Sequence, residues 1–270
     1  MKVRRKSKKP MQTSQNEVIS QLGELKLRHI AHALEADLGT MAEVERSIVL
    51  KYLGKWLDSE KTERKTQLIA ARIRSAKFRK IQTVDGFNFK HSPVTERVEK
   101  NYLTLYHSMC RENLPSAVFT GNAGLGKTHL ARALGYGACQ RGLTVLFVTA
   151  AEMVNHLGHA QKTYSLEQEL NKFRKPQVLI IDELGYVSLD TQASNLFFQV
   201  ISARHDAELG TIATTNLPFG KFNQIFANDA IAHAIVDRLV NDAEVFYMEG
   251  DSYRPHQRKE LLKKRKLAAS

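Results

Sequence analysis

Residues 121–128 read Gly-Asn-Ala-Gly-Leu-Gly-Lys-Thr, between the short apolar run Ala117–Thr120 and an apolar helical pattern that begins at Leu130. A GxxxxGK[ST] loop between a strand and a helix is the arrangement that binds the phosphates of a nucleotide. Its glycines let successive backbone N–H groups surround the anion, and the helix directs its positive N-terminus at it. The segment therefore predicts a nucleoside triphosphate site within an α/β domain.

The loop residues have separate expected roles. Lys127 is expected to reach the β- and γ-phosphates, and the hydroxyl of Thr128 to coordinate Mg²⁺. A glycine-rich turn without a ligand is the alternative, and the motif described next weighs against it. The residues expected to contact ATP are Gly121, Asn122, Ala123, Gly124, Leu125, Gly126, Lys127, Thr128 and His129.

A second motif ends the apolar run Gln177–Ile181 with Asp182 and Glu183. A continuous apolar, β-branched run is typical of a strand buried on both faces. Asp182 is expected to bind Mg²⁺, and Glu183 to orient or deprotonate the attacking water. The second carboxylate favours a hydrolase, because a small-molecule kinase takes its nucleophile from another substrate.

Three more strands are predicted over Thr144–Val148, Gly210–Thr215 and Glu244–Met248, with helical stretches between them. This alternation predicts a central parallel sheet covered by helices, whose ligands bind at the carboxyl ends of the strands. Asn216 follows the second of these strands and is a candidate to position the attacking water. A turn or capping role before Pro218 is the equal alternative for Asn216.

Residues 11–80 are predicted to form a small all-α domain, and residues 95–257 the ATPase domain. Apolar residues recur at helical spacing through Leu27–Leu38 and again through Val49–Leu57, and a third helix is expected to begin near Ser59. Residues 81–94 contain glycine and proline and are predicted to connect the domains. In this connector Phe87 and Phe89 either pack on the ATPase domain or line the adenine pocket.

Positive charge gathers in three segments of a chain whose formal net charge is +12. The tail 1–10, the stretch 61–80 and the tail 258–270 are rich in lysine and arginine, whereas the rest is net acidic. Such clustering favours contact with a phosphate backbone, although solvated tails would also carry it. The DNA-binding candidates, expected on the last helix of the N-terminal domain, are Arg72, Arg74, Lys77, Arg79 and Lys80.

Apolar runs and cysteines place limits on the protein class. No apolar run approaches the roughly 20 residues that cross a bilayer. Cys110 and Cys139 form neither a disulfide framework nor a zinc pattern, so both are expected to be buried free thiols. We therefore expect a cytoplasmic protein without a membrane partner.

These two motifs, together with three other segments, resemble the IstB-like transposition helpers of bacterial insertion sequences, a branch of the AAA+ ATPases close to DnaC-type helicase loaders. The matching segments are GNAGLGKTHLA at Gly121–Ala131, VLIIDELGY at Val178–Tyr186, Thr214–Asn216, AIVDRLV at Ala234–Val240 and GDSYR at Gly250–Arg254. The resemblance implies a P-loop AAA+ core and an arginine finger, Arg238, that reaches the nucleotide of a neighbouring subunit. Arg204 and Arg254 are further candidates for phosphate or subunit contacts, with surface salt bridges as the alternative.

The resemblance also implies the partners. These are double-stranded DNA, a cognate transposase and further copies of the same chain, assembled under the control of ATP and Mg²⁺. A helicase loader that prefers single-stranded DNA is the nearest alternative function. A small-molecule kinase and a nucleotide-binding scaffold without hydrolysis are more distant ones.

Overall fold

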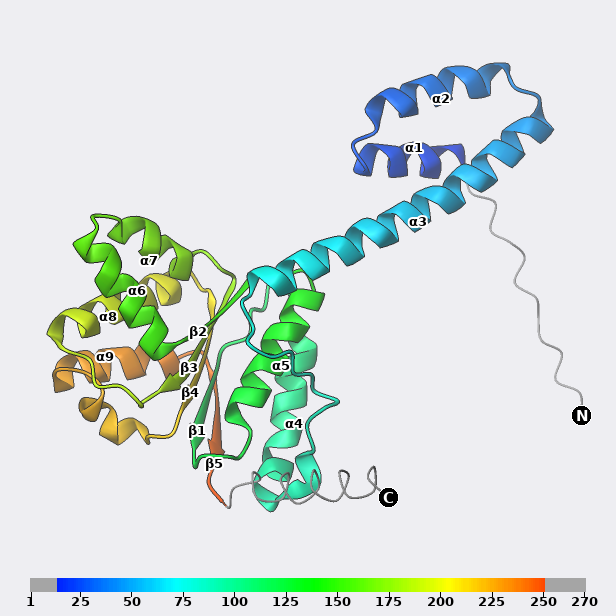
Figure 1. The fold of residues 1–270 in the computed structure, drawn as a ribbon. Coiled ribbons are helices and arrows are strands. Elements are labelled where there is room, and N and C mark those ends of the chain that lie inside the picture. The colour runs from blue at the N-terminus through cyan, green and yellow to red at the C-terminus, as the bar shows by residue number, and fades with distance from the viewer. Residues whose placement is uncertain (1–13, 251–270) are drawn as a thin grey trace, which may run out of the picture. The chain divides into compact units, whose positions relative to one another are not determined.

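The computed structural model of the chain describes residues 14–250 (Figure 1). The two basic tails, 1–10 and 258–270, and Arg254 lie outside the described residues. The described chain divides into two compact units between Leu68 and Ile69. Residues 69–80, which the sequence analysis assigned to the helical domain, thus belong to the larger unit.

The smaller unit is helical, and its sequence explains where the helices begin and what they bury. Ser14 and Glu17 form a capping box in which each side chain accepts a hydrogen bond from the other's backbone N–H. The three helices bury one apolar core that includes Val18, Leu22 and Leu38. They are α1 (Gln15–Glu24), α2 (Arg28–Thr40) and the part of α3 (Glu43–Ser75) that precedes Ile69.

The expectation of a new helix near Ser59 is wrong, because α3 runs through this position without a break. The sequence from residue 55 to residue 75 contains neither glycine nor proline. Glu60 and Arg64 pair one turn apart along the helix, at 2.6 Å, and such pairs favour a continuous helix. The hydroxyl of Thr62 donates to the carbonyl of Asp58 within the helix, so the polar residues here do not form a cap.

The larger unit contains a five-stranded parallel sheet of strand order β2-β3-β4-β1-β5, which confirms the predicted α/β architecture (Figure 1). All five predicted strands are present, with small shifts at the ends of three of them. Parallel register aligns the carboxyl ends of the strands at one edge. The strands are β1 (Ala117–Gly121), β2 (Val145–Thr149), β3 (Val178–Leu184), β4 (Gly210–Thr215) and β5 (Glu244–Met248).

Helices cover both faces of the sheet and bury two apolar layers (Figure 1). On one face lie α4 (Pro93–Ser108) and α5 (Lys127–Gln140), which pack on side chains such as Phe119 and Ile180. On the other face lie α6 to α9, which pack on side chains such as Leu179 and Ile181. The remaining elements are η1 (Phe89–His91), α6 (Ala150–Lys162), α7 (Leu166–Arg174), α8 (Thr191–Asp206), η2 (Phe219–Gln224) and α9 (Asp229–Val240).

Arg204 is a structural residue of this fold, and the expectation of a surface salt bridge or phosphate contact is wrong. Its side chain is fully buried at the end of α8. The guanidinium donates to several backbone carbonyls, among them those of Phe173 at 2.9 Å, Pro176 at 2.8 Å and Gly210 at 2.5 Å. Burial lowers the pKa of Arg204 to about 9. Arg204 thus joins α8 to the chain that enters β3 and β4.

The two cysteines differ in their surroundings, which corrects the expectation that both are buried. Cys139 is buried in α5, where burial raises the pKa of its thiol to about 11, whereas Cys110 is exposed just after α4. Both are free thiols. Within residues 14–250, no helix has the length and apolar character needed to cross a bilayer.

Candidate nucleotide site

Glycines shape the loop that connects β1 to α5. Gly124 and Gly126 adopt φ values of 83° and 92°, in the left-handed region that favours glycine. A Cβ atom at Gly126 would lie 2.4 Å from Cε2 of Phe87, and one at Gly121 would lie 2.0 Å from the carbonyl oxygen of Met248. The loop therefore needs glycine both for its backbone conformation and for its close packing.

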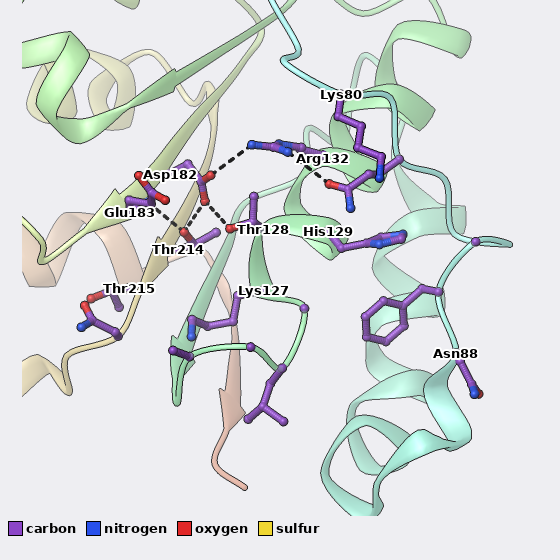
Figure 2. Close-up of a pocket in the computed structure, with 18 of the residues that line it drawn as sticks. Lys80, Asn88, Lys127, Thr128, His129, Arg132, Asp182, Glu183, Thr214 and Thr215 are labelled. Carbon is purple, nitrogen blue, oxygen red and sulfur yellow. Dashed lines mark hydrogen bonds and ion pairs between the residues drawn. The ribbon is translucent and has the colours of Figure 1, made fainter. Parts of the chain in front are cut away.

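Lys127 begins α5 and extends its side chain back over the loop (Figure 2). Its ammonium nitrogen Nζ donates to the carbonyl oxygens of Gly121, at 2.6 Å, and Asn122, at 2.7 Å. The positive charge thus lies inside the loop, where the sequence analysis expects the phosphates. The helix N-terminus adds its own partial positive charge at the same place.

Asp182 lies on β3, opposite the first turn of α5, and three side chains converge on its carboxylate (Figure 2). Its Oδ1 accepts hydrogen bonds from the hydroxyls of Thr128, at 2.8 Å, and Thr214, at 2.6 Å. Its Oδ2 lies 3.6 Å from Nη2 of Arg132. The structure therefore brings together Thr128 and Asp182, the two expected metal ligands, which are 54 residues apart in the sequence.

Glu183 follows Asp182 at a bulge in β3, with a φ of 62°. A left-handed conformation costs a non-glycine residue about 1–2 kcal/mol, and such residues gather at functional sites. The backbone N–H of Glu183 donates to the hydroxyl of Thr214 at 3.0 Å, which holds this conformation. The side chain is exposed and lines the same cavity as the glycine-rich loop.

Asn216 comes directly after β4 and lines the cavity. Its side-chain oxygen Oδ1 is buried and has no hydrogen-bond partner within residues 14–250. A Cβ atom at Gly185 would lie 2.9 Å from this oxygen, so the glycine leaves room for the asparagine. A buried acceptor without a partner, in a residue that lines the cavity, suits the binding of water or a ligand hydroxyl.

One cavity of about 640 Å³ contains these groups, and the segment before α4 forms its remaining wall. Phe87 lies against His129 with ring centroids 5.2 Å apart, and His129 Nε2 lies 2.9 Å from the carbonyl oxygen of Thr83. Phe89 is buried in the core, whereas Phe87 lines the cavity. Both rings pack on the ATPase domain, since Phe87 also packs against Phe89, with ring centroids 4.7 Å apart. A contact between Phe87 and adenine stays a prediction.

Arg132 and Thr214 are site residues that the sequence analysis did not assign. Arg132 stacks over the ring of Phe147 at 4.6 Å and donates to the side-chain oxygen of Gln82 at 3.4 Å. Burial lowers the pKa of Arg132, and the nearby charge of Asp182 opposes that change. An arginine within an otherwise apolar helix pattern was the only local signal of this role.

The structure does not bring Arg238 into the nucleotide cavity of its own chain. Arg238 lies on α9, where its Nη1 donates to the carbonyl oxygen of Ala234 at 3.1 Å. Its guanidinium lies over the ring of Phe198 at 4.9 Å. Any contact of Arg238 with a nucleotide would therefore be with that of another subunit.

The five DNA-binding candidates do not all lie on a helix, as the sequence analysis expected. Arg72 and Arg74 are in the last turn of α3, whereas Lys77, Arg79 and Lys80 follow its end. Lys77 adopts a φ of 59°. Arg79 pairs with Glu152 at 2.5 Å, and Lys80 lines the nucleotide cavity. Helix α3 ends at Ser75 because the following residues run beside β2, where the N–H of Phe147 donates to the carbonyl of Ala76.

Sequence comparisons relate the chain to proteins of insertion sequences. Residues 20–261 match the family of IstB-like ATP binding proteins. The chain is 36% identical over 217 residues to the ATP-binding protein of insertion sequence IS5376 from Geobacillus stearothermophilus, covering 80% of this chain and 85% of that one. It is 31% identical over 245 residues to the corresponding protein of IS232 from Bacillus thuringiensis subsp. berliner, covering 90% and 96%.

Solved structures with a similar fold come from replication proteins. A DnaC helicase loader superposes with a TM-score of 0.53 at 20% identity, covering 62% of this chain and 96% of that one. AMPPCP-bound DnaA from Aquifex aeolicus gives a TM-score of 0.54 at 19% identity, covering 67% and 55%. At these identities the likeness establishes the fold alone, and it confirms the expected P-loop AAA+ core.

Proposed function

The chain belongs to the IstB-like ATP-binding protein family and is an ATPase, and on that premise we propose that it is a DNA-binding helper of transposition. In this proposal ATP controls its assembly on duplex DNA, and the assembly recruits or stimulates a transposase. Membership of the family agrees with the resemblance drawn from the sequence. It also favours an ATPase over a small-molecule kinase.

The observation that carries the proposal is the meeting of Thr128, Asp182 and Glu183 in the cavity that the glycine-rich loop also lines. A hydroxyl and a carboxylate are oxygen donors of the kind that Mg²⁺ prefers, and they lie 2.8 Å apart. Thr128 and Asp182 would hold the ion, which when bound to ATP neutralises charge on the phosphates. Lys127 then binds the β- and γ-phosphates from within the loop.

Hydrolysis is assigned to the groups around the expected position of the γ-phosphate. Glu183 orients the attacking water and accepts its proton, since it is the exposed carboxylate beside Asp182. Asn216 positions the same water through its side-chain oxygen, which has no hydrogen-bond partner among residues 14–250. Arg238 of a neighbouring subunit stabilises the charge that develops on the phosphate, so hydrolysis requires an oligomer.

A physical link between ATP and DNA is supported by where the basic segment lies. Arg72, Arg74 and Lys77 precede Lys80, which lines the nucleotide cavity. Residues 80–83 therefore connect the proposed DNA contacts to the pocket wall. A nucleotide that fills the cavity would press on this segment and alter the presentation of the basic side chains. The two basic tails would add further contacts with phosphates.

The proposed partner follows from the names of the relatives, which are ATP-binding proteins of insertion sequences. A helper encoded by such an element would act with its transposase. The alternative of a helicase loader draws on the fold shared with DnaC. The two functions differ in the DNA expected to bind, duplex for the helper and single strands for the loader.

Glu183→Gln gives the most direct test of the function. With ATP, this variant is expected to remain bound to duplex DNA as an oligomer, because it binds the nucleotide but cannot activate water. Lys127→Ala is the matched control and should neither bind ATP nor assemble. Electrophoretic mobility shift and ATP turnover would be measured with duplex and single-stranded DNA. Hydrolysis by Glu183→Gln at the wild-type rate would refute its role, and a preference for single strands would favour the loader.

A further inference from the structure

Arg132 places a full positive charge beside the carboxylate that is expected to bind Mg²⁺ (Figure 2). Its Nη2 lies 3.6 Å from Oδ2 of Asp182, and the two side chains are only 14% and 2% exposed. The hydroxyls of Thr128 and Thr214, which donate to Oδ1 of the same carboxylate, are neutral. Arg132 therefore supplies a positive charge that balances the negative charge of Asp182.

The packing of α5 holds this charge in place. Arg132 lies one helical turn after Thr128, on the same side of the helix. Its guanidinium lies over the ring of Phe147 at 4.6 Å, and its Nη1 donates to the side-chain oxygen of Gln82 at 3.4 Å. Because the guanidinium is held both by an aromatic ring and by polar groups, we expect it to stay beside Asp182 when a ligand enters the cavity.

The charge of Arg132 acts in opposite directions on the two expected ligands. Arg132 lines the cavity together with Lys127 and the glycine-rich loop, so it attracts the negative phosphates of ATP. It also neutralises Asp182 and repels a divalent cation, and such effects are strong where little solvent screens them. Arg132 should thus strengthen the binding of ATP without metal and weaken the attraction between Asp182 and Mg²⁺.

We propose that Arg132 makes ATP binding less dependent on Mg²⁺, by balancing the charge of Asp182 and by adding its own charge to the wall of the cavity. This inference rests on the proposed function, in which Thr128 and Asp182 hold the ion. It deepens that function by assigning to a further residue the coupling between metal and nucleotide. We measure this coupling as the Mg²⁺ gain, the ratio of the ATP affinity with Mg²⁺ to the ATP affinity with a chelator.

Calorimetric titration of ATP into the full-length chain, with Mg²⁺ and with a chelator, tests this role. Arg132→Met removes the charge but keeps an unbranched side chain over Phe147. With the chelator this variant should bind ATP more weakly than the wild type does, and its Mg²⁺ gain should be at least about tenfold larger. An unchanged Mg²⁺ gain would overturn the proposal. So would a wild type that binds no detectable ATP with the chelator, since Arg132 is proposed to support that binding.

Three further variants separate the charge of Arg132 from its packing. Arg132→Lys keeps the charge and should keep a Mg²⁺ gain close to that of the wild type. Arg132→Gln keeps a hydrogen-bond donor and should show the same rise as Arg132→Met, which provides a second neutral variant if the methionine disturbs folding. Arg141→Met is the matched control, because the guanidinium of Arg141 also lies over a ring, that of Tyr106 at 4.6 Å, at the end of the same helix and outside the nucleotide cavity.

Arg141→Met should leave the Mg²⁺ gain unchanged, and circular dichroism and a thermal melt would show that each variant is folded. If Arg132→Lys behaves like Arg132→Met, or if Arg141→Met raises the gain equally, the local charge at Arg132 is not the cause and the proposal fails.

Asp182→Asn in the same titration distinguishes failure of this inference from failure of the proposed function. If Asp182→Asn keeps the full Mg²⁺ gain of the wild type, the ion is not held at Asp182, and the proposed site itself is wrong. If Asp182→Asn loses the gain while Arg132→Met leaves it unchanged, the site stands and the role given to Arg132 is wrong.

Discussion

Replacing Thr214 with valine removes one hydroxyl from the nucleotide site with almost no change in shape. This buried hydroxyl donates to Asp182 at 2.6 Å and accepts from the backbone N–H of Glu183 at 3.0 Å. A bond to a charged group contributes about 1.5–3 kcal/mol, and an unpaired buried N–H costs about 1–3 kcal/mol. Allowing for partial relaxation, we expect Thr214→Val to lower the free energy of unfolding by about 3 kcal/mol.

The same change is expected to slow catalysis more than it weakens ATP binding. Thr214 holds Glu183 in its left-handed conformation, so its loss displaces the proposed base, and a 1 Å displacement can cost about 100-fold in rate. Lys127 and the loop are untouched, so the KM for ATP should change little. Steady-state ATP turnover in the DNA-bound state and a thermal melt measure the two effects. For a domain of this size, about 3 kcal/mol corresponds to a fall in Tm of roughly 10 °C.

Thr120→Val is the matched control for this experiment. Thr120 lies on the neighbouring strand β1, and its hydroxyl donates to the carbonyl of Leu217 at 3.1 Å. Losing that single neutral bond should cost about 1 kcal/mol and leave the turnover number near that of the wild type. The reasoning is refuted if Thr214→Val turns over ATP at the wild-type rate, or if the control slows it equally.

Three further predictions concern the loop, a buried arginine and a capping carboxylate. Gly126→Ala would place a Cβ atom 2.4 Å from Phe87 at a residue whose φ is 92°. ATP binding, measured by calorimetry, should therefore weaken at least about tenfold. Unchanged affinity would contradict the loop geometry. Arg204→Met leaves several buried carbonyls without a donor, so the free energy of unfolding, measured by urea denaturation, should fall by about 3–5 kcal/mol. A fall below about 1 kcal/mol would show that water replaces the guanidinium. The pKa of Glu152 is lowered from 4.5 to about 2, first by the backbone N–H of Thr149 and then by Arg79, so its stabilisation is complete above pH 4.5 and is lost as the pH falls toward 2. The stability difference between wild type and Glu152→Gln should therefore shrink over that interval, and a constant difference would contradict the shift.

Local patterns in the sequence were sufficient for the sheet and the glycine-rich loop. A strand buried on both faces must be apolar throughout, as Val178–Ile181 is, and only glycine tolerates the loop conformation at Gly126. The end of such a strand also marks where polar residues meet the ligand. Asp182 and Thr128 could therefore be placed together before the fold was known.

Roles that depend on distant contacts could not be predicted in this way. The carbonyl acceptors of Arg204 include residues some 30 positions earlier, and no local pattern indicates them. Arg132 meets Asp182 and Phe147 only once the sheet and α5 have packed. The prediction of a new helix near Ser59 failed for another reason. A serine is compatible both with a helix cap and with a helix interior that is stabilised by pairs of side chains such as Glu60 and Arg64.

The central claim is that a triphosphate and Mg²⁺ are held between the glycine-rich loop and Asp182. Calorimetric titration of ATP into wild-type protein and Asp182→Asn, each with Mg²⁺ and with a chelator, tests it most directly. We predict that Mg²⁺ strengthens ATP binding to the wild type, that Asp182→Asn loses most of this gain, and that Lys127→Ala binds under neither condition. If Asp182→Asn keeps the full gain from Mg²⁺, or if Lys127→Ala binds ATP like the wild type, the triphosphate and its metal are not held there.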